Sequence, residues 1–442
     1  MTRIGFAYNQ KPEFSAPRAA ADADAAPPDE EPPSSRRDVP SRTPAPPVHA
    51  GAALASPVAS VASVATRATP PAAPSASPPR PSPLPTSDEY AEWDTGETID
   101  AVVHALGALG EVIRLEANAD FPERLRRVRP DIVFNMAEGL HGVNRESHVP
   151  AICEFFDVPY SGSDPFTLSL CLDKARTKEV LGHHGVPTAA FALVRTAAEC
   201  AGLRPRLTAR RRPARAGAPA SARPLQFPLF VKPVHEGSSK GITERNFVRT
   251  LEELEAQVTF LLEAYAQPVL VEEFLPGAEF TCAVLGNGRE ARVLPIIGMN
   301  FGALPEGAVP IYGYEAKWLW DRPERPLDIF ECPARIDERL RSAIEDVTLR
   351  AYHVLGCRDW SRVDVRLDAA GAPHVVEVNP LPGILPNPAD NSCFPKAARA
   401  AGISYDELIQ TCLLLAAERQ GVALPGQVAR AARRALATGS VA

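Results

Sequence analysis

The chain has 442 residues, 46 of them proline, with 45% hydrophobic and 23% charged residues, so most of it reads as two or three globular domains. The formal net charge of −7 argues against a general nucleic-acid or anionic-membrane binder, because such proteins need a basic excess. Eight scattered cysteines without a C-x-x-C pair indicate reduced thiols rather than a disulfide framework or a zinc site. We find neither a secretory signal pattern nor an apolar run of roughly 20 residues, so we expect a cytoplasmic enzyme.

The beginning of the chain predicts an α/β domain over residues 1–14 and 88–166. Strand patterns at 3–8, 111–115 and 131–135 surround a helical pattern at 97–106. Strand, helix and strand in succession indicate a parallel sheet. A helix over 146–156 and a strand end at 158–162 complete this domain.

Three segments have a biased composition. Residues 15–87 contain 18 prolines in 73 residues and no aromatic residue, so we expect a disordered insertion that buries too little apolar surface to fold. Residues 204–224 carry seven arginines and no acid, which predicts a solvated loop insertion or, alternatively, a basic docking patch. Residues 421–442 read as a terminal tail.

The remaining sequence predicts two further α/β domains, at 167–274 and 275–420. The first combines helices over 168–181 and 251–264 with strands at 191–194, 229–233 and 269–274. The second is rich in strands between 279 and 378, with helices over 337–355 and 405–419. The fold class is therefore α/β (α+β).

Polar side chains alternate with apolar ones on two strands near the end of the chain. Strand periodicity puts Arg362, Asp364 and Arg366 on one face of the first strand. With a four-residue turn pairing 368 with 373, Asp364 lies opposite Glu377 and Arg362 opposite Asn379. Carboxylate and carboxamide oxygens are ligands that suit Mg²⁺, although a solvated hairpin with ordinary ion pairs is the alternative.

A loop rich in glycine and serine follows a strand at Lys232–Gly241. Glycines allow a close approach to phosphate, and the backbone N–H groups and hydroxyls can donate to its oxygens. The Walker A pattern is absent, which argues against a P-loop NTPase. Taken alone, this loop is equally consistent with an ordinary surface turn.

Eight motifs in order resemble the D-alanine–D-alanine ligase family of the ATP-grasp superfamily. They are Leu172–Lys174, Phe230–Lys232, Glu236–Ser239, Val271–Glu273, Pro276–Thr281, Tyr314–Lys317, Arg362–Asp364 and Glu377–Asn379. The resemblance implies an ATP-grasp fold of three α/β domains, with the nucleotide between the central and C-terminal domains. It also implies that ATP phosphorylates a carboxylate and that an amine then attacks the acyl phosphate.

The resemblance assigns roles to residues of this chain. Lys174 and Lys232 would contact the α- and β-phosphates, and the Gly237–Ser239 loop, with Ser238 among the catalytic residues, would cover the β/γ end. Nucleotide contacts would also come from Glu272, Glu273, Phe274 and Leu275 at the adenine and from Glu279 at the ribose. The residues Asp364, Glu377 and Asn379 would hold two Mg²⁺ ions, or Mn²⁺. Catalysis would use Arg362 and the Gly383 N–H at the oxyanion, and Lys317 on a lid over the γ-phosphate. We expect Lys178 and Lys240 to be solvated surface residues.

The resemblance is weaker at the amino-acid site. The family usually carries a glycine-rich turn and a glutamate after the first strand, and no clear equivalent follows Tyr8 here. We instead expect first-substrate contacts from residues at the carboxyl end of a strand, where open α/β sheets bind ligands: Asn135, Glu138, Arg145 and Glu146. The leading hypothesis is D-alanyl-D-alanine synthesis for peptidoglycan from small-molecule amino acids, in a homodimer. A ligase for another amino-acid pair and a non-catalytic ATP-binding module remain the alternatives.

Overall fold

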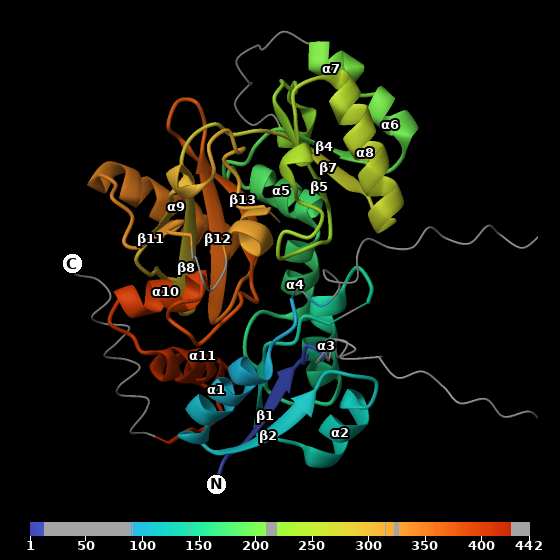
Figure 1. The fold of residues 1–442 in the computed structure, drawn as a ribbon. Helices are drawn as coiled ribbons and strands as arrows, with labels where there is room; N and C mark the ends of the chain where they lie inside the picture. The colour runs from blue at the N-terminus through green and yellow to red at the C-terminus, as the bar shows by residue number, and fades with distance from the viewer. Residues whose placement is uncertain are drawn as a thin grey trace, which may run out of the picture. The chain divides into compact units, whose positions relative to one another are not determined.

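The computed structural model describes residues 1–12, 90, 92–139, 141–208, 219–313, 315–321 and 327–425. These residues form three sheets with helices packed on them (Figure 1). The predicted disordered insertion at 15–87, the middle of the arginine-rich segment and all but the start of the terminal tail lie outside the described residues.

The first sheet is parallel, as the sequence predicts. Its order is β2 (Glu111–Glu116), β1 (Arg3–Tyr8) and β3 (Ile132–Asn135), with β1 pairing in parallel with both neighbours. The helices of this region are α1 (Gly96–Gly107), α2 (Phe121–Val128) and α3 (His148–Phe155). The carboxyl ends of β1 and β3 therefore lie at one edge of the sheet, where the chain continues into polar segments.

Two helices occupy the region where the sequence predicts one over 168–181. These are α4 (Pro165–Leu172) and α5 (Lys174–His183), and Asp173 between them has an extended backbone. Its carboxylate accepts hydrogen bonds from the N–H groups of Ala175 and Arg176, which caps α5. The prediction of one continuous helix is wrong because this cap starts a new one, and Lys174 becomes its first residue.

The second sheet is antiparallel. Its order is β4 (Phe191–Val194), β7 (Val269–Glu273), β5 (Leu229–Pro233) and β6 (Phe247–Val248). The helices of this region are α6 (Ala197–Ala201), α7 (Arg204–Thr208) and α8 (Leu251–Tyr265), and α8 buries an apolar stripe against the sheet. Both ends of the arginine-rich segment are fixed here, because Arg206 donates to the carbonyl oxygens of Phe191 and Arg223.

The third sheet has six strands in the order β11-β10-β8-β12-β13, with β9 paired to β8. The strands are β8 (Glu279–Leu285), β9 (Arg292–Val293), β10 (Ile297–Met299), β11 (Phe330–Glu331), β12 (Trp360–Leu367) and β13 (Pro373–Asn379). Its helices are α9 (Glu338–Val354), α10 (Cys393–Ala400) and α11 (Tyr405–Gln420). Helix α9 packs on the valines of β12, so the polar residues of that strand point to the opposite face.

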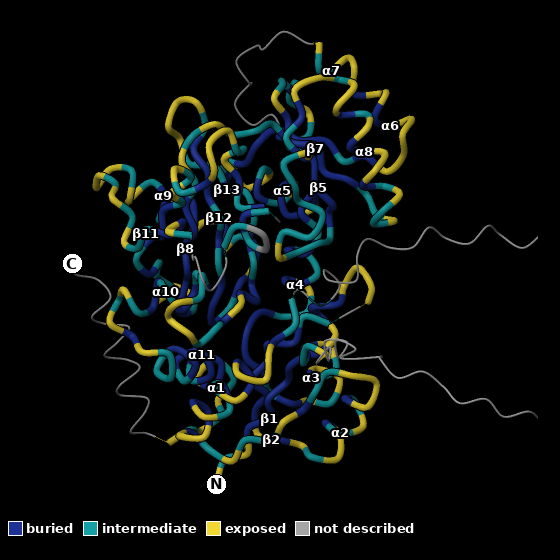
Figure 2. The backbone as a smooth tube through the Cα atoms, in the orientation of Figure 1, coloured by how far each residue is buried: buried dark blue, intermediate teal, exposed yellow. Residues whose placement is uncertain are grey.

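Helix α11 returns to the first sheet and lies beside α1 (Figure 1). The Gln410 side chain donates to the Ala105 carbonyl oxygen at 2.9 Å. Figure 2 shows β5, β7, β8 and β12 buried in the interior. Short helical turns complete the structure: η1 (Arg145–Ser147), η2 (Ala220–Ala222), η3 (Glu244–Asn246), η4 (Gly288–Glu290), η5 (Phe301–Ala303) and the π-helical η6 (Glu315–Trp320).

Each of the three predicted domains contains one of these sheets, while their exact limits stay a prediction. Among the described residues, no helix has both the length and the apolar character needed to cross a membrane.

Candidate functional site

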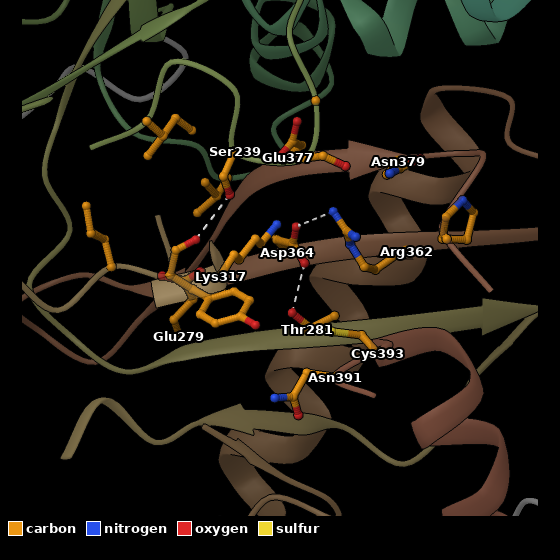
Figure 3. Close-up of a pocket in the computed structure, with 18 of the residues that line it drawn as sticks. Ser239, Glu279, Thr281, Lys317, Arg362, Asp364, Glu377, Asn379, Asn391 and Cys393 are labelled. Carbon is orange, nitrogen blue, oxygen red and sulfur yellow. Dashed lines mark hydrogen bonds and ion pairs between the residues drawn. The ribbon is translucent and has the colours of Figure 1, made fainter. Parts of the chain in front are cut away.

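A cavity of about 550 Å³ lies between the second sheet and the β12–β13 hairpin of the third. Every residue that the sequence nominates for the nucleotide, the metal or catalysis lines it. These are Lys174, Lys232, Gly237, Ser238, Ser239, Glu272, Glu273, Phe274, Leu275, Glu279, Lys317, Arg362, Asp364, Glu377, Asn379 and Gly383. Figure 3 labels ten of the lining residues, among them Arg362, Asp364, Glu377 and Asn379, which come from adjacent strands.

The hairpin has the predicted register at its functional end. Asp364 lies opposite Glu377 and Arg362 opposite Asn379, which confirms both pairings. The predicted pairing of 368 with 373 is wrong, because the Asp368 N–H donates to the Ala372 carbonyl oxygen and closes a shorter turn. Gly371 supplies the positive φ of +79° that such a turn requires. A β-bulge at Val376 then restores the register, so the two differences cancel before Asp364.

The polar side chains of the hairpin contact one another and β8. The Asp364 carboxylate accepts a hydrogen bond from the Thr281 hydroxyl at 2.9 Å and lies 3.1 Å from an Arg362 guanidinium nitrogen (Figure 3). The carboxamide oxygen of Asn379 accepts from the Leu381 N–H at 2.9 Å. The Arg362 Nε is buried and has no hydrogen-bond partner among the described residues, so it can still donate to a ligand.

Two lysines join the second sheet and α5 to carboxylates in the cavity. The Lys174 Nζ lies 2.8 Å from the Glu377 carboxylate, and the Lys232 Nζ lies 2.7 Å from that of Glu272. Burial alone would raise the pKa of Glu377, but Lys174, Lys232 and Arg362 outweigh it and lower that pKa to about 2. The carboxylate is therefore ionised at neutral pH.

The prediction that Lys178 is a solvated surface residue is wrong. Its side chain is 2% exposed, and its Nζ lies 2.7 Å from the Glu272 carboxylate and donates to the Thr188 hydroxyl. Burial would raise the pKa of Glu272, but Lys178 and Lys232 together lower it to about 2. Helical spacing was the available signal, because residue 178 follows Lys174 by four positions and so shares its face of α5.

The glycine- and serine-rich loop has an unusual backbone. Ser238 and Ser239 have φ angles of +47° and +62°, which cost non-glycine residues about 1–3 kcal/mol each and are concentrated at functional sites. The Ser239 hydroxyl donates to the Tyr312 carbonyl oxygen at 3.1 Å, which ties this loop to the segment before η6. A Cβ atom at Gly237 would collide with the Glu92 carboxylate.

Lys317 and Gly383 enter the cavity from the third domain. Lys317 lies on η6 with its Nζ 5.3 Å from the centre of the Tyr312 ring. Burial and the nearby Arg362 charge lower the pKa of Lys317. The Gly383 carbonyl oxygen accepts from the Ser392 hydroxyl at 3.2 Å, and its Cα faces open space.

Only one of the four residues nominated for the first substrate lines the cavity. Glu138 lines the cavity, whereas Asn135, Arg145 and Glu146 do not. The Asn135 carboxamide instead accepts from the Ala137 N–H at 3.1 Å and holds the turn after β3. Burial and the negative charges around Glu138, first of all that of Glu146, raise the pKa of Glu138 well above its usual value. Burial also raises the pKa of Glu146 to about 7, although Arg145 opposes the shift.

Residues Glu92–Thr95 line the same part of the cavity, and the sequence reasoning missed them. They follow the long insertion in the sequence, but a bridge between Gln10 and Asp94 brings them back to the end of β1. Glu92 contacts Arg145 at 3.0 Å and Lys240 at 2.8 Å. The expectation that Lys240 is a solvated residue is also wrong, because its side chain is 11% exposed.

The hairpin fits a magnesium site by its chemistry. Within the described ranges there is no group of three or more His, Cys, Asp or Glu side chains arranged for a metal. The set at the hairpin instead combines two carboxylates with the carboxamide of Asn379, all hard oxygen donors of the kind that Mg²⁺ takes alongside substrate phosphates.

Comparison with known proteins defines first the fold and then the family. The crystal structure of D-alanine–D-alanine ligase from Bacillus anthracis complexed with ATP has a TM-score of 0.55 at 22% identity, over 76% of this chain and 95% of that one. The fold is therefore the ATP-grasp fold, as predicted.

Sequence comparison then identifies the family. A family model described as D-ala D-ala ligase C-terminus matches residues 206–414. D-alanine–D-alanine ligase of Pelotomaculum thermopropionicum is 30% identical, over 76% of this chain and 95% of its own length. An uncharacterised protein of Sinorhizobium fredii is 34% identical, over 74% and 89%. The chain belongs to the D-alanine–D-alanine ligase family and is an ATP-dependent ligase.

Proposed function

We propose that this enzyme joins two amino acids by an amide bond through an acyl phosphate formed from ATP. The observation that carries the proposal is the 2.8 Å contact between Lys174, on α5, and Glu377, on the C-terminal hairpin. It brings the lysine proposed for the nucleotide and the carboxylate proposed for the metal to one point of the cavity. When a nucleotide binds, a phosphate group can pair with Lys174 in place of Glu377, because the ammonium group attracts it directly. The same phosphate can be linked to Glu377 by a divalent cation that both groups bind.

The nucleotide would occupy the side of the cavity formed by β5, β7 and the connection to β8. Lys174 and Lys232 would contact the α- and β-phosphates, and the loop containing Gly237 and Ser239 would cover the β/γ end. The base and ribose would be contacted by Glu272, Glu273, Phe274, Leu275 and Glu279, all of which line the cavity.

Two Mg²⁺ ions, replaceable by Mn²⁺, would be held by Asp364, Glu377 and Asn379. The ions would supply positive charge between the phosphates and the attacking carboxylate, where each pair of like charges at 4 Å costs about 4 kcal/mol at an effective dielectric of 20.

The catalytic residues act on the carbonyl carbon and the γ-phosphate. Arg362, whose buried Nε has no partner among the described residues, and the Gly383 N–H would stabilise the tetrahedral oxyanion. Lys317 would neutralise charge on the transferring phosphoryl group, and the Ser238 hydroxyl would donate a hydrogen bond to it. Because η6 bears Lys317 and the Ser239 loop is tied to the residues before it, both segments would exclude water from the acyl phosphate.

D-Alanine is the proposed amino acid at both positions, and the dipeptide would serve peptidoglycan synthesis. The name of the Pelotomaculum relative supports this choice. Glu138, on the wall of the cavity, would contact the ammonium group of the first substrate; Asn135, Arg145 and Glu146 would support that wall from outside. Eight free cysteines support a reducing, cytoplasmic location, and we propose a homodimer.

Phosphate release from ATP tests this proposal across a panel of D- and L-amino acids. We expect turnover that depends on Mg²⁺ and D-alanine, with a dipeptide formed for each phosphate. Turnover with other amino acids but not with D-alanine would keep the ligase and reject the substrate. Nucleotide binding without turnover on any acceptor would reject the ligase reaction in favour of a binding module.

A further inference from the structure

Arg366 on β12 is a buried arginine that spans the connection between β7 and β8. It is 5% exposed and lines the cavity. Its Nε donates to the Leu275 carbonyl oxygen at 2.6 Å, and its Nη1 donates to the Glu279 carboxylate at 2.6 Å. Glu279 also lies directly opposite Arg366 in the ladder between β8 and β12. One guanidinium therefore fixes two groups that belong to different ends of the connection.

Two aromatic rings limit the remaining freedom of this guanidinium. Its carbon atom lies 4.4 Å from the centre of the Phe274 ring and 5.3 Å from that of Phe301. A planar guanidinium can stack on rings and donate in its own plane at the same time, which a lysine ammonium cannot do. The hydrogen bonds and the ring contacts together define one orientation of the side chain.

The backbone of the connection is attached to the same strand. The Gly277 N–H donates to the Leu367 carbonyl oxygen at 3.0 Å, and the Leu367 N–H donates to that of Ala278 at 2.9 Å. The residue next to Arg366 thus holds the middle of the connection while Arg366 holds Leu275 and Glu279. This arrangement leaves the Glu279 carboxylate with a fixed position relative to the Leu275 backbone.

We propose that Arg366 is a positioning residue for the nucleoside half of the nucleotide, acting through Glu279. By holding one oxygen of the Glu279 carboxylate, it aims the group so that the carboxylate accepts hydrogen bonds from the two vicinal ribose hydroxyls. Arg366 itself need not touch the nucleotide. The inference rests on the proposed nucleotide site and deepens it, because it predicts selection for a ribonucleotide over a deoxyribonucleotide.

Direct binding of ATP, 2′-deoxy-ATP and 3′-deoxy-ATP to the full chain tests the inference, with affinities measured by calorimetry. The wild type is expected to bind ATP at least about tenfold more tightly than either deoxynucleotide, because each lost hydroxyl removes one of the hydrogen bonds that the carboxylate accepts. R366M keeps an unbranched chain between the two rings and removes the donors. In R366M we expect ATP to bind about tenfold more weakly and the three nucleotides to bind within about threefold of one another.

R341M is the matched control. Arg341 lies exposed on α9 and pairs with Glu338 and Glu345, so this variant should retain both the affinity and the preference of the wild type. If R366M does not fold, as judged by thermal unfolding, R366K replaces it. Lysine can pair with Glu279 but cannot also stack on the rings and hold Leu275. The ratio of the R366K affinity for ATP to its affinity for the deoxy analogues should therefore lie between one and the wild-type ratio.

Two results would overturn the inference. One is an R366M or R366K protein that keeps the wild-type preference for ATP over its deoxy analogues, even if all three affinities fall. The other is a wild type that binds ATP and both analogues equally, which would leave ligation itself intact. Failure of the wild type to bind any of the nucleotides would instead reject the proposed function as well, so the two failures are distinguishable.

Discussion

Replacing Glu272 by glutamine should destabilise the protein most at neutral pH. In the structure the Glu272 carboxylate lies 2.7 Å from both the Lys178 and the Lys232 ammonium groups, and all three side chains are at most 6% exposed. Burial raises the pKa of Glu272, but the two lysines lower it from 4.5 to about 2. A lowering of this size corresponds to about 3 kcal/mol of stability at pH 7.

The sign of the pH dependence follows from the lowered pKa. The contribution of the Glu272 carboxylate is complete above its unfolded value of 4.5 and is lost as the pH falls toward 2. E272Q also leaves two buried lysines without their counter-charge, so we expect a loss of about 3–5 kcal/mol at pH 7. At about pH 3.5 the difference between wild type and variant should be smaller by about 1 kcal/mol.

Urea unfolding at the two pH values measures these free energies. E263Q is the control, because Glu263 is an exposed residue of α8 in the same domain, and its effect should stay within about 0.5 kcal/mol. A loss below about 1 kcal/mol at pH 7, or one that grows on acidification, would refute the assignment of Glu272 as a buried carboxylate held ionised by two lysines.

The remaining predictions concern close packing, the segment over the cavity and the metal. G277A should lower the free energy of unfolding by about 1–3 kcal/mol, because its Cβ would lie 2.6 Å from that of Leu367. The control G383A, whose Cβ would meet nothing within 4 Å, should unfold like the wild type. Equal melting temperatures for G277A and G383A would contradict this prediction. Asp321 accepts hydrogen bonds from the Tyr312 hydroxyl, the Leu327 N–H and, at 2.5 Å, the Asn391 carboxamide. Because N391A removes one of these bonds from the segment over the cavity, it should slow ligation about tenfold and increase ATP hydrolysis without product. An unchanged ratio of phosphate to dipeptide would argue against a role of Asn391 in excluding water. Chelation with EDTA should abolish turnover and added Mg²⁺ or Mn²⁺ should restore it, and activity that survives EDTA would exclude the proposed ions.

The sequence allowed the hairpin to be predicted because its chemistry is local. Strand alternation fixes which side chains of β12 share a face. The predicted pairing of Asp364 with Glu377 is correct because the shorter turn and the bulge offset each other. The shorter turn and the Val376 bulge were missed, although the consecutive valines 375 and 376 interrupt the alternation at the position of the bulge.

Residues that depend on long-range contacts were harder to predict. Lys178 and Lys240 look like ordinary surface lysines until their acidic partners, 94 and 148 residues away in sequence, are placed beside them (Glu272 and Glu92). The Glu92–Thr95 segment was hidden in the same way, because the insertion separates it from β1 although the two pair in space. Asp173 is a different case, because it caps α5 through the N–H groups two and three positions along the chain, and aspartate is a typical N-cap residue that the sequence displays.

The chemistry proposed for the cavity is tested most directly by isotope transfer. The enzyme would be incubated with Mg-ATP and D-alanine that carries ¹⁸O in both carboxylate oxygens, and the released phosphate would be analysed by mass spectrometry. An acyl phosphate requires one carboxylate oxygen to leave with phosphorus when the amine attacks, so the account predicts one ¹⁸O atom in each phosphate formed with dipeptide. Dipeptide formation with unlabelled phosphate would contradict it.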